Sequence, residues 1–241
     1  MSAPALSEKE AAAAPARARP GRRELIAGAI LTVALLTHFV RLAERPLHHD
    51  ESIHAYQSHT LARDGTWRYD PAYHGPFLYY ANALVYKIFG ASDFTARLLP
   101  AIFGLILIAF AIPLSRWIGK DGALVYALLV LISPHLTYFS RFIREDIYSL
   151  VFTLGTIIAF RRFLEMDRFR WLVLSSVSFA LAGATKENAY MTGVLFVAFG
   201  LWAFAERIAV APKKGEAVSE TWRRTRDWIA RHFLQLIAAG L

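Results

Sequence analysis

The sequence predicts an all-α protein, a polytopic bundle of transmembrane helices with further helices in a long external loop. Apolar and aromatic residues make up 56% of the 241 residues, and charged residues only 19%, below the quarter usual in soluble domains. The Lys and Arg residues lie in short blocks between long apolar runs, as in multi-span membrane proteins. Membrane orientation therefore accounts for the net charge of +8, and no nucleic-acid partner is expected. The absence of cysteine excludes disulfides, a thiolate nucleophile and Cys-ligated metals.

The N-terminal segment, residues 1–24, is rich in Ala, Pro and Arg and predicts a disordered basic tail. Arginines between positions 17 and 23 precede the first apolar run, Leu25–Val40. A cleaved signal peptide is the alternative, but the run is long for one and lacks a small-residue cleavage site. We expect a retained anchor in the plasma membrane, with the N-terminus in the cytoplasm.

Five more apolar runs predict a total of six spans in a transmembrane domain over residues 25–206. Several runs are shorter than the ~20 residues that a perpendicular helix needs, so we expect their ends to extend into polar flanks. Strict alternation then puts the Lys/Arg-rich connections in the cytoplasm, which is the side expected for them. The five runs are Phe94–Ser115, Ala123–Phe139, Ile147–Phe160, Trp171–Ala184 and Met191–Ala205.

The remaining sequence predicts two further segments. Residues 207–232 are basic and should form a cytoplasmic loop. Residues 233–241 are apolar but cover about half the length that a span requires, so they are expected to begin a seventh span of a longer protein.

The first external loop, about residues 44–93, is too long to be a passive connection. Within it, Pro76–Phe89 shows helical spacing of apolar residues but is too short to span, which predicts an interfacial helix. Ser52–Ala62 is a second candidate helix. If Pro76–Phe89 crossed the membrane instead, every later basic block would lie on the wrong side.

Four polar clusters fall on the external side of this topology, and each alone is compatible with an ordinary turn. Together they place carboxylates for proton abstraction and fixed cations for a phosphate beside the lipid boundary. For Asp50 in the first cluster, helix capping, a general base and a metal ligand all stay open. The clusters are His48–Glu51, Tyr73–Phe77, Arg141–Asp146 and Thr185–Asn188.

Five motifs carry a resemblance to a known superfamily: Asp50-Glu51, His74-Gly75-Pro76-Phe77, Ala96-Arg97-Leu98-Leu99-Pro100, Arg144-Glu145-Asp146 and Thr185-Lys186. In type, order and membrane side they resemble the polytopic glycosyltransferases of the GT-C superfamily, which includes protein O-mannosyltransferases and the aminoarabinose transferase of lipid A. Within it, the chain is similar to an archaeal and bacterial membrane family described as flippase-activity-associated. The resemblance covers nearly all of residues 24–206. One departure is Glu187, where the aminoarabinose transferases usually have Gly.

The resemblance implies a glycosyltransferase of the cell envelope that moves a sugar from a polyprenyl-phosphate donor to a glycan, lipid or protein acceptor on the external face, for example in protein glycosylation. Asp50 is the expected general base, with Glu51 orienting Asp50 or the acceptor. Lys186 and Arg144 are the expected ligands of the donor phosphate. The expected substrate-binding residues are Asp146, Glu145, His74 and Glu187.

Two questions stay open at this stage. Some members of the superfamily use a divalent cation and others do not, and the sequence does not decide between them. The alternative function is a non-catalytic component that aids the flipping or docking of lipid-linked oligosaccharide. A transporter is disfavoured, because the sequence shows no internal repeat and no broken spans.

Overall fold

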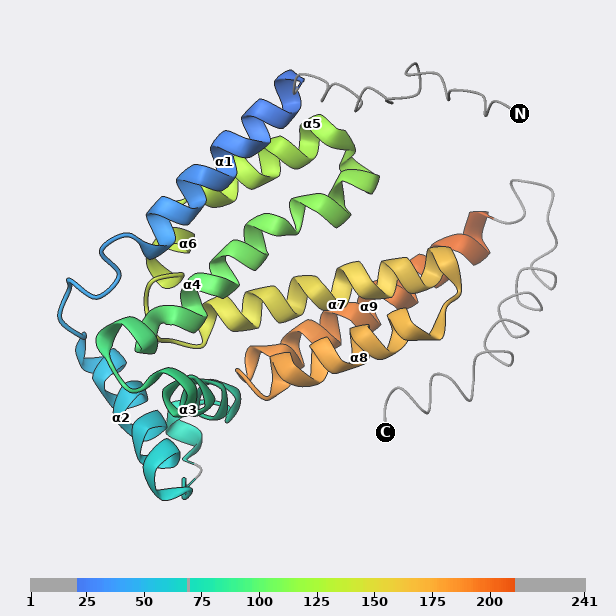
Figure 1. The fold of residues 1–241 in the computed structure, drawn as a ribbon. Helices are drawn as coiled ribbons and strands as arrows, with labels where there is room; N and C mark the ends of the chain where they lie inside the picture. Colours follow the sequence, from blue (N-terminus) through green and yellow to red (C-terminus); the bar gives the residue numbers. More distant parts are fainter. Residues whose placement is uncertain (1–20, 69, 211–241) are drawn as a thin grey trace, which may run out of the picture.

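The computed structural model describes residues 21–68 and 70–210, and this part of the chain is helical with no β-strand. It has the all-α architecture predicted from the sequence (Figure 1). The helices are α1 (Arg22–Phe39), α2 (His49–Asp64), the 3-10 turn η2 (Pro71–Tyr73), α3 (Phe77–Phe89), α4 (Asp93–Ala109), α5 (Ala111–Ile132), α6 (Pro134–Phe139), α7 (Asp146–Met166), α8 (Phe169–Gly183) and α9 (Asn188–Val210).

The long helices form two groups that run along the molecule. In Figure 1, α1 lies against α5 and α4, while α7 packs along α8 with α9 beside them. The pair α2 and α3 lies at one end of the bundle, where α4 and α7 begin. The segment between the first two apolar runs thus forms a helical cap on this end, and it contains the two helices predicted there.

A reversal at Gly119 separates the second and third apolar runs. Its φ of 75° and ψ of 167° are not helical, so α5 consists of two helices that meet at this residue. Glycine adopts a positive φ at little cost, whereas residues with a Cβ do so rarely. The chain thus turns back between the second and third apolar runs, where the sequence predicted two separate spans.

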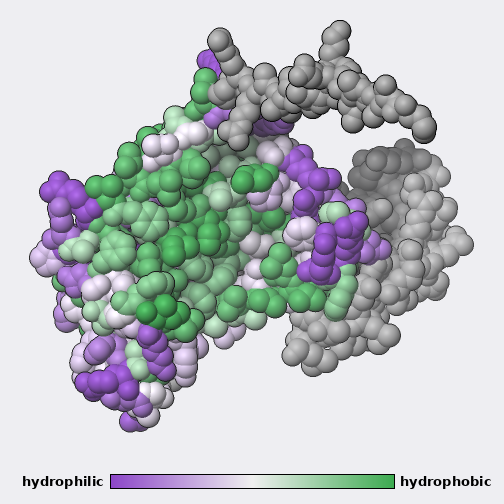
Figure 2. All heavy atoms as spheres, viewed as in Figure 1, coloured by the Kyte–Doolittle hydropathy of each residue, from purple (hydrophilic) through white to green (hydrophobic). Residues whose placement is uncertain are grey.

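The surface of the bundle is apolar along its length and polar at its ends. Figure 2 shows a hydrophobic band over the long helices, with hydrophilic residues gathered at both ends of the described part. Asp93–Ile132 and Asp146–Met166 are long and apolar enough to cross a bilayer, and two shorter apolar helices follow them. These features agree with a membrane-embedded bundle.

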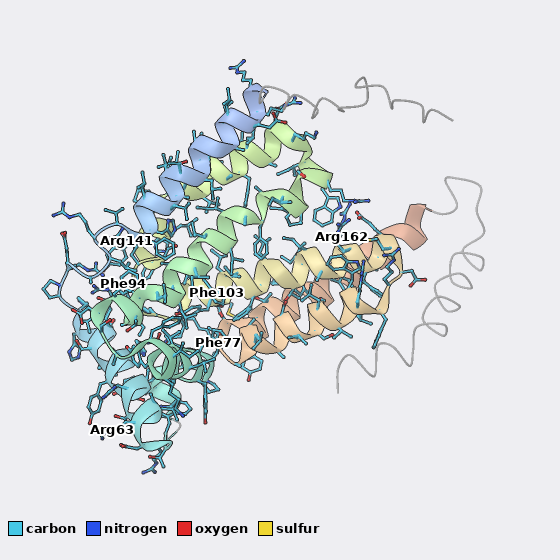
Figure 3. The ribbon with its side chains drawn as sticks, in the orientation of Figure 1. Arg63, Phe77, Phe94, Phe103, Arg141 and Arg162 are labelled. Atoms are coloured by element: carbon cyan, nitrogen blue, oxygen red, sulfur yellow. The ribbon has the colours of Figure 1, made fainter. Side chains whose placement is uncertain are left out.

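An aromatic cluster fixes the cap to the bundle. Phe77 of α3 makes edge contacts with Phe103 of α4, Tyr148 of α7 and Phe152 of α7, with ring centroids 6.0, 5.4 and 4.8 Å apart (Figure 3 labels Phe77 and Phe103). Such edge-to-face pairs are favourable beyond the area they bury. The start of α3 is consequently held against the residues that open α7.

Some boundaries differ from the sequence predictions. The second helix begins at His49 and not at Ser52, because His48 caps it by accepting a hydrogen bond from the Asp50 backbone N–H at 3.3 Å. The first helix begins at Arg22, inside the predicted tail. The last helix extends to Val210, past the predicted start of the basic loop. The rest of the tail, the rest of that loop and the predicted seventh span lie outside the described residues.

Candidate active site

Charged side chains from three separate segments meet at the capped end of the bundle. Arg144 lies between two carboxylates, with its Nη1 3.5 Å from Asp50 Oδ2 and its Nε 3.3 Å from Asp146 Oδ2. The ammonium of Lys186 donates to Asp146 Oδ1 at 2.5 Å. Asp50 lies in the first turn of α2, Asp146 is the first residue of α7, and Lys186 lies in the turn before α9. The structure therefore brings together four of the residues that the sequence predicted for the site.

This network is open enough to meet a ligand. The side chains of Asp50, Arg144 and Asp146 are between 31% and 40% exposed, and that of Lys186 is 23% exposed. Each cation keeps N–H groups beyond those that contact Asp146, because a guanidinium has five donors and an ammonium has three. The two cations share the carboxylate of Asp146 and can face one anion, and Asp50 lies beside them with its carboxylate partly exposed.

His74 and Glu187 form a second pair beside this network. His74 Nδ1 lies 2.8 Å from Glu187 Oε2, and hydrogen bonds, including one from His74, hold the pKa of Glu187 below its usual value. The backbone joins the same two segments, since the N–H groups of Gly75 and Phe77 donate to the carbonyls of Thr185 and Ala184 at 3.1 and 3.0 Å.

Gly75 permits this close approach. A Cβ at Gly75 would lie 2.1 Å from the carbonyl oxygen of Ala184, a distance that no side chain can tolerate. The segment before α3 and the turn that carries Lys186 are thus in direct backbone contact.

Glu51, predicted as a catalytic residue, has a different environment from Asp50. Its side chain is fully buried, and Arg97 of α4 donates to both of its oxygens at 2.8 Å. It also accepts from the backbone N–H of His48 at 3.0 Å and of Ile143 at 3.3 Å. Burial raises its pKa, but the hydrogen bonds from Arg97 and His48 outweigh burial and the net pKa is lowered. Of the two roles expected for Glu51, this buried position favours orienting Asp50 over contacting the acceptor directly.

Arg97 also holds the loop before α2. Its Nη1 donates to the carbonyls of Leu42 and Arg45 at 3.1 and 2.7 Å, and its Nη2 to that of Pro46 at 3.1 Å. Although it is almost fully buried, all its nitrogen atoms donate hydrogen bonds. The position of Asp50 is consequently tied to α4 through its neighbour Glu51.

Glu145, predicted to bind substrate, lies beneath the open network. Neither of its oxygens has a hydrogen-bond partner among the described residues, and its side chain is fully buried. His54 Nε2 lies 3.6 Å from Glu145 Oε1, and His54 Nδ1 lies 2.8 Å from the hydroxyl of Tyr79. Burial raises the pKa of Glu145 to about 7 and lowers the pKa of His54 to about 4. Between about pH 4 and pH 7 the pair therefore holds one proton, on the carboxyl group.

Sequence reasoning did not assign a site role to Arg97 or Tyr79, and it considered His54 only as a metal ligand together with Asp50. The signal for Arg97 was present, because an arginine near the start of an apolar span is costly unless it has buried partners. For His54 and Tyr79 the sequence carried no comparable signal, since both fit the pattern of an amphipathic surface helix.

The residues described do not fit a resident divalent cation. Asp50 faces Arg144, Asp146 faces Lys186, and Glu51 faces Arg97. Within residues 21–68 and 70–210 there is no group of three His, Asp or Glu side chains placed to hold one ion. The protein's own cations occupy the carboxylates that a hard metal ion would need.

Comparisons with known proteins add two findings. The profile of a protein family described as dolichyl-phosphate-mannose-protein mannosyltransferase matches residues 73–214. A search of curated proteins finds no match.

Two solved structures share the fold. ArnT from Cupriavidus metallidurans in the apo state superposes with a TM-score of 0.64 at 21% identity, over 89% of this chain and 40% of that one. The same protein bound to undecaprenyl phosphate gives a TM-score of 0.59 at 23% identity, over 89% and 39%. The chain thus spans about 40% of the length of the solved structures it matches. The resemblance to GT-C membrane glycosyltransferases is confirmed by these findings.

Proposed function

Because the chain belongs to the dolichyl-phosphate-mannose-protein mannosyltransferase family, we propose that it transfers a sugar from a polyprenyl-phosphate carrier to an acceptor at the external membrane face. The observation that carries this proposal is the connected network of Asp50, Arg144, Asp146 and Lys186 at the capped end. A structural relative was solved with undecaprenyl phosphate bound, which supports a lipid phosphate as the donor carrier.

The proposed reaction assigns a role to each charge. The acceptor hydroxyl loses its proton to the Asp50 carboxylate as its oxygen bonds to the anomeric carbon of the sugar. The bond from that carbon to the phosphate oxygen breaks, and the polyprenyl phosphate leaves with the electron pair. Arg144 and Lys186 stabilise the negative charge that grows on the phosphate, in a site bordered by apolar helices. Water then takes the proton from Asp50.

Other residues position these groups. Asp146 contacts both cations and so fixes their separation. Glu51 and Arg97 act through the backbone, because Glu51 holds α2 against Ile143, the residue before Arg144. His74 and Glu187 adjoin the Lys186 turn, where we place the donor sugar.

We also propose the topology. The described helices α1, α4 with the first part of α5, the second part of α5 with α6, α7, α8 and α9 are the six spans of the domain 25–206. The N-terminus lies in the cytoplasm, and the basic segment 207–232 follows on the same side. The network then faces the external side, where lipid-linked donors replace nucleotide sugars.

The test uses the full-length protein in membranes, with dolichyl-phosphate mannose as the first donor. Asp50→Asn removes the proton acceptor but keeps its size, and transfer should fall by roughly 10²- to 10⁴-fold, while binding of undecaprenyl phosphate stays normal. Lys186→Ala should weaken binding of undecaprenyl phosphate itself. Asp64→Asn, at an exposed carboxylate that ends the same helix and pairs with Arg63, is the control and should have normal transfer.

Near-normal transfer by Asp50→Asn would reject Asp50 as the base. The non-catalytic role in flipping or docking would be supported by a different result. In that case the protein binds the lipid phosphate through Lys186, but neither the wild type nor Asp50→Asn transfers sugar from any donor.

A further inference from the structure

A second site lies on the cap, further along α2 from Asp50. A hollow of about 900 Å³ opens between α2 and the segment that leads to η2, within the size range of ligand pockets. None of its lining residues belongs to the ion network. They are Tyr56, Gln57 and Thr60 of α2, Thr66, Trp67, Arg68 and Asp70 of the following segment, and Tyr73 of η2.

The lining combines ring faces with hydrogen-bonding groups. Three of the residues are aromatic, and Tyr56 is 70% exposed, so its ring faces solvent. Around the rings stand a carboxylate, a guanidinium, a primary amide and two hydroxyls. Tyr and Trp rings have apolar faces and a polar group at the edge, so they suit a ligand that has both apolar and polar surfaces. The planar carboxylate and guanidinium can each form hydrogen bonds with two adjacent hydroxyls of a ligand. A pyranose has C–H faces and vicinal hydroxyls and matches this lining.

Several of these groups are already fixed in place. The Trp67 ring stacks on Tyr79 with centroids 4.8 Å apart, and its Nε1 donates to Gln57 Oε1 at 2.9 Å. Asp70 Oδ1 accepts from the backbone N–H of Ala72 at 2.9 Å. Because these side chains are already ordered without a ligand, binding a ligand costs less side-chain conformational entropy.

The position of the hollow favours a water-soluble group. Figure 2 shows the end of the molecule formed by α2 as hydrophilic, apart from the apolar band along the long helices, and Arg63 marks this end in Figure 3. A polyprenyl chain would lie along the apolar band and bring its phosphate to Arg144 and Lys186. The hollow is therefore suited to the other substrate.

The hollow also adjoins the buried part of the active site. The carbonyl of Tyr73 accepts from the Tyr79 hydroxyl at 3.1 Å, and that hydroxyl contacts His54, the neighbour of Glu145. Two tyrosines and one histidine thus separate the hollow from the carboxyl group beneath the network.

From this arrangement we propose that the hollow is a carbohydrate-binding subsite that holds a sugar of the acceptor, so that the acceptor substrate is a glycan or glycoconjugate. The proposal rests on the proposed transferase function and names the acceptor class for it. Tyr56 and Trp67 stack on the sugar, while Arg68 and Asp70 bond its hydroxyls.

The test measures binding of methyl α-mannopyranoside and mannobiose to the full-length protein in nanodiscs by saturation-transfer difference NMR. Tyr56→Ala should weaken apparent sugar binding by roughly tenfold, whereas Tyr56→Phe, which keeps the ring, should bind normally. Arg68→Gln should weaken binding, and Arg63→Gln, an exposed arginine of the same cap outside the hollow, should not. Undecaprenyl phosphate binding should be normal in all four variants.

Sugar binding unaffected by Tyr56→Ala and Arg68→Gln, or no sugar binding by the wild type, would overturn the subsite. Loss of undecaprenyl phosphate binding in Tyr56→Ala would assign the hollow to the donor and overturn the acceptor role. Asp50→Asn separates the two proposals, because it should stop transfer and leave sugar binding intact. Normal transfer by that variant would reject Asp50 as the general base and would leave the proposal of the sugar subsite unaffected.

Discussion

Arg97 and Glu51 illustrate how single residues set the geometry of this site. A buried ion pair is costly to desolvate, and the cost is met only when every remaining donor and acceptor finds a partner. Here the guanidinium donates to two carboxylate oxygens and three backbone carbonyls. A lysine could not reproduce this planar fork. The pair therefore serves to hold one loop conformation, the one that presents Asp50 to Arg144.

His54 and Glu145 form a buried titratable pair beneath the open network. Unfolded, the histidine would hold a proton below pH 6.5 and the carboxylate would release its proton above pH 4.5; folded, the two pKa values are about 4 and about 7. Between pH 4.5 and 6.5 both states hold one proton on this pair, so its contribution to stability is nearly independent of pH. The groups that also act on the pair are Asp50, Arg144, His74, Asp146 and Lys186.

We predict that Glu145→Gln stabilises the protein in a pH-dependent way. The folded pKa of Glu145 is raised, so the contribution of Glu145 alone falls as pH rises from 4.5 to about 7. In the wild type the opposite contribution of His54 offsets this fall up to about pH 6.5, whereas the neutral amide of the variant removes the fall and leaves the gain. The difference in unfolding free energy should grow over this range to on the order of 3 kcal/mol and stay constant above pH 7. Thermal unfolding in detergent at several pH values measures it.

Glu44→Gln, at an exposed carboxylate that pairs with Arg41, serves as the control for this series. A Glu145→Gln variant whose stability follows that of the wild type at every pH would contradict the raised pKa.

Among the elements, the junction of the segment before α3 with the turn before α9 matters most for the site. Two backbone hydrogen bonds cross it, and the His74–Glu187 pair lies beside them. Lys186 is in the same turn, so its ammonium is located by main-chain contacts and by Asp146. A turn fixed in this way can present a cation to a phosphate without rearrangement.

Gly75→Ala should disrupt this junction. Its Cβ would meet the carbonyl of Ala184 at 2.1 Å and must push the turn away, carrying Lys186 with it. We expect transfer to fall by roughly 10²-fold, with weaker binding of undecaprenyl phosphate. Gly28→Ala, in α1 where nothing lies within 4 Å of the new methyl group, should be normal. Normal lipid phosphate binding in Gly75→Ala would show that the junction does not position Lys186.

The elements and the open network were predictable from sequence, whereas the buried layer was not. Apolar runs locate the helices, and the alternation of spans puts Asp50, Arg144 and Lys186 at the same end. The partners of Glu51 and Glu145 could not be predicted, because Arg97 and His54 come from other helices and no local pattern specifies such pairs. The cap at His48 was also missed, since Asp50 and Ser52 are the more usual capping types.

At the scale of the whole molecule, the two polar ends differ in kind. One end, formed by α2, α3 and the turn after α8, carries the network and the hollow. The other end has the start of α1, the reversal at Gly119 and the turn at Asp167, with arginines such as Arg162, which Figure 3 shows far from Arg141. The basic end fits the cytoplasmic side of a membrane.

Single-cysteine labelling tests this orientation, and the chain's lack of cysteine makes it direct. Thr66→Cys should react with a membrane-impermeant maleimide in intact cells. Lys120→Cys and Arg168→Cys should react only after the membrane is permeabilised. All three positions are exposed, so burial would not mask them. Labelling of Thr66→Cys and Lys120→Cys from the same side would refute the proposed topology.

The hydrogen bonds of Glu51 also set the order in which the catalytic end can be completed during synthesis. Its partners Arg97 and Ile143 lie 46 and 92 residues further along the chain. A ribosome that adds roughly 5 to 20 residues per second needs about 5 to 20 seconds to cover the longer interval. For that time a carboxylate destined for a dry interior must stay in water or at the lipid headgroups. Under the proposed mechanism, Asp50 can therefore take its final place only after the segments that carry Arg97 and Ile143 have been synthesised.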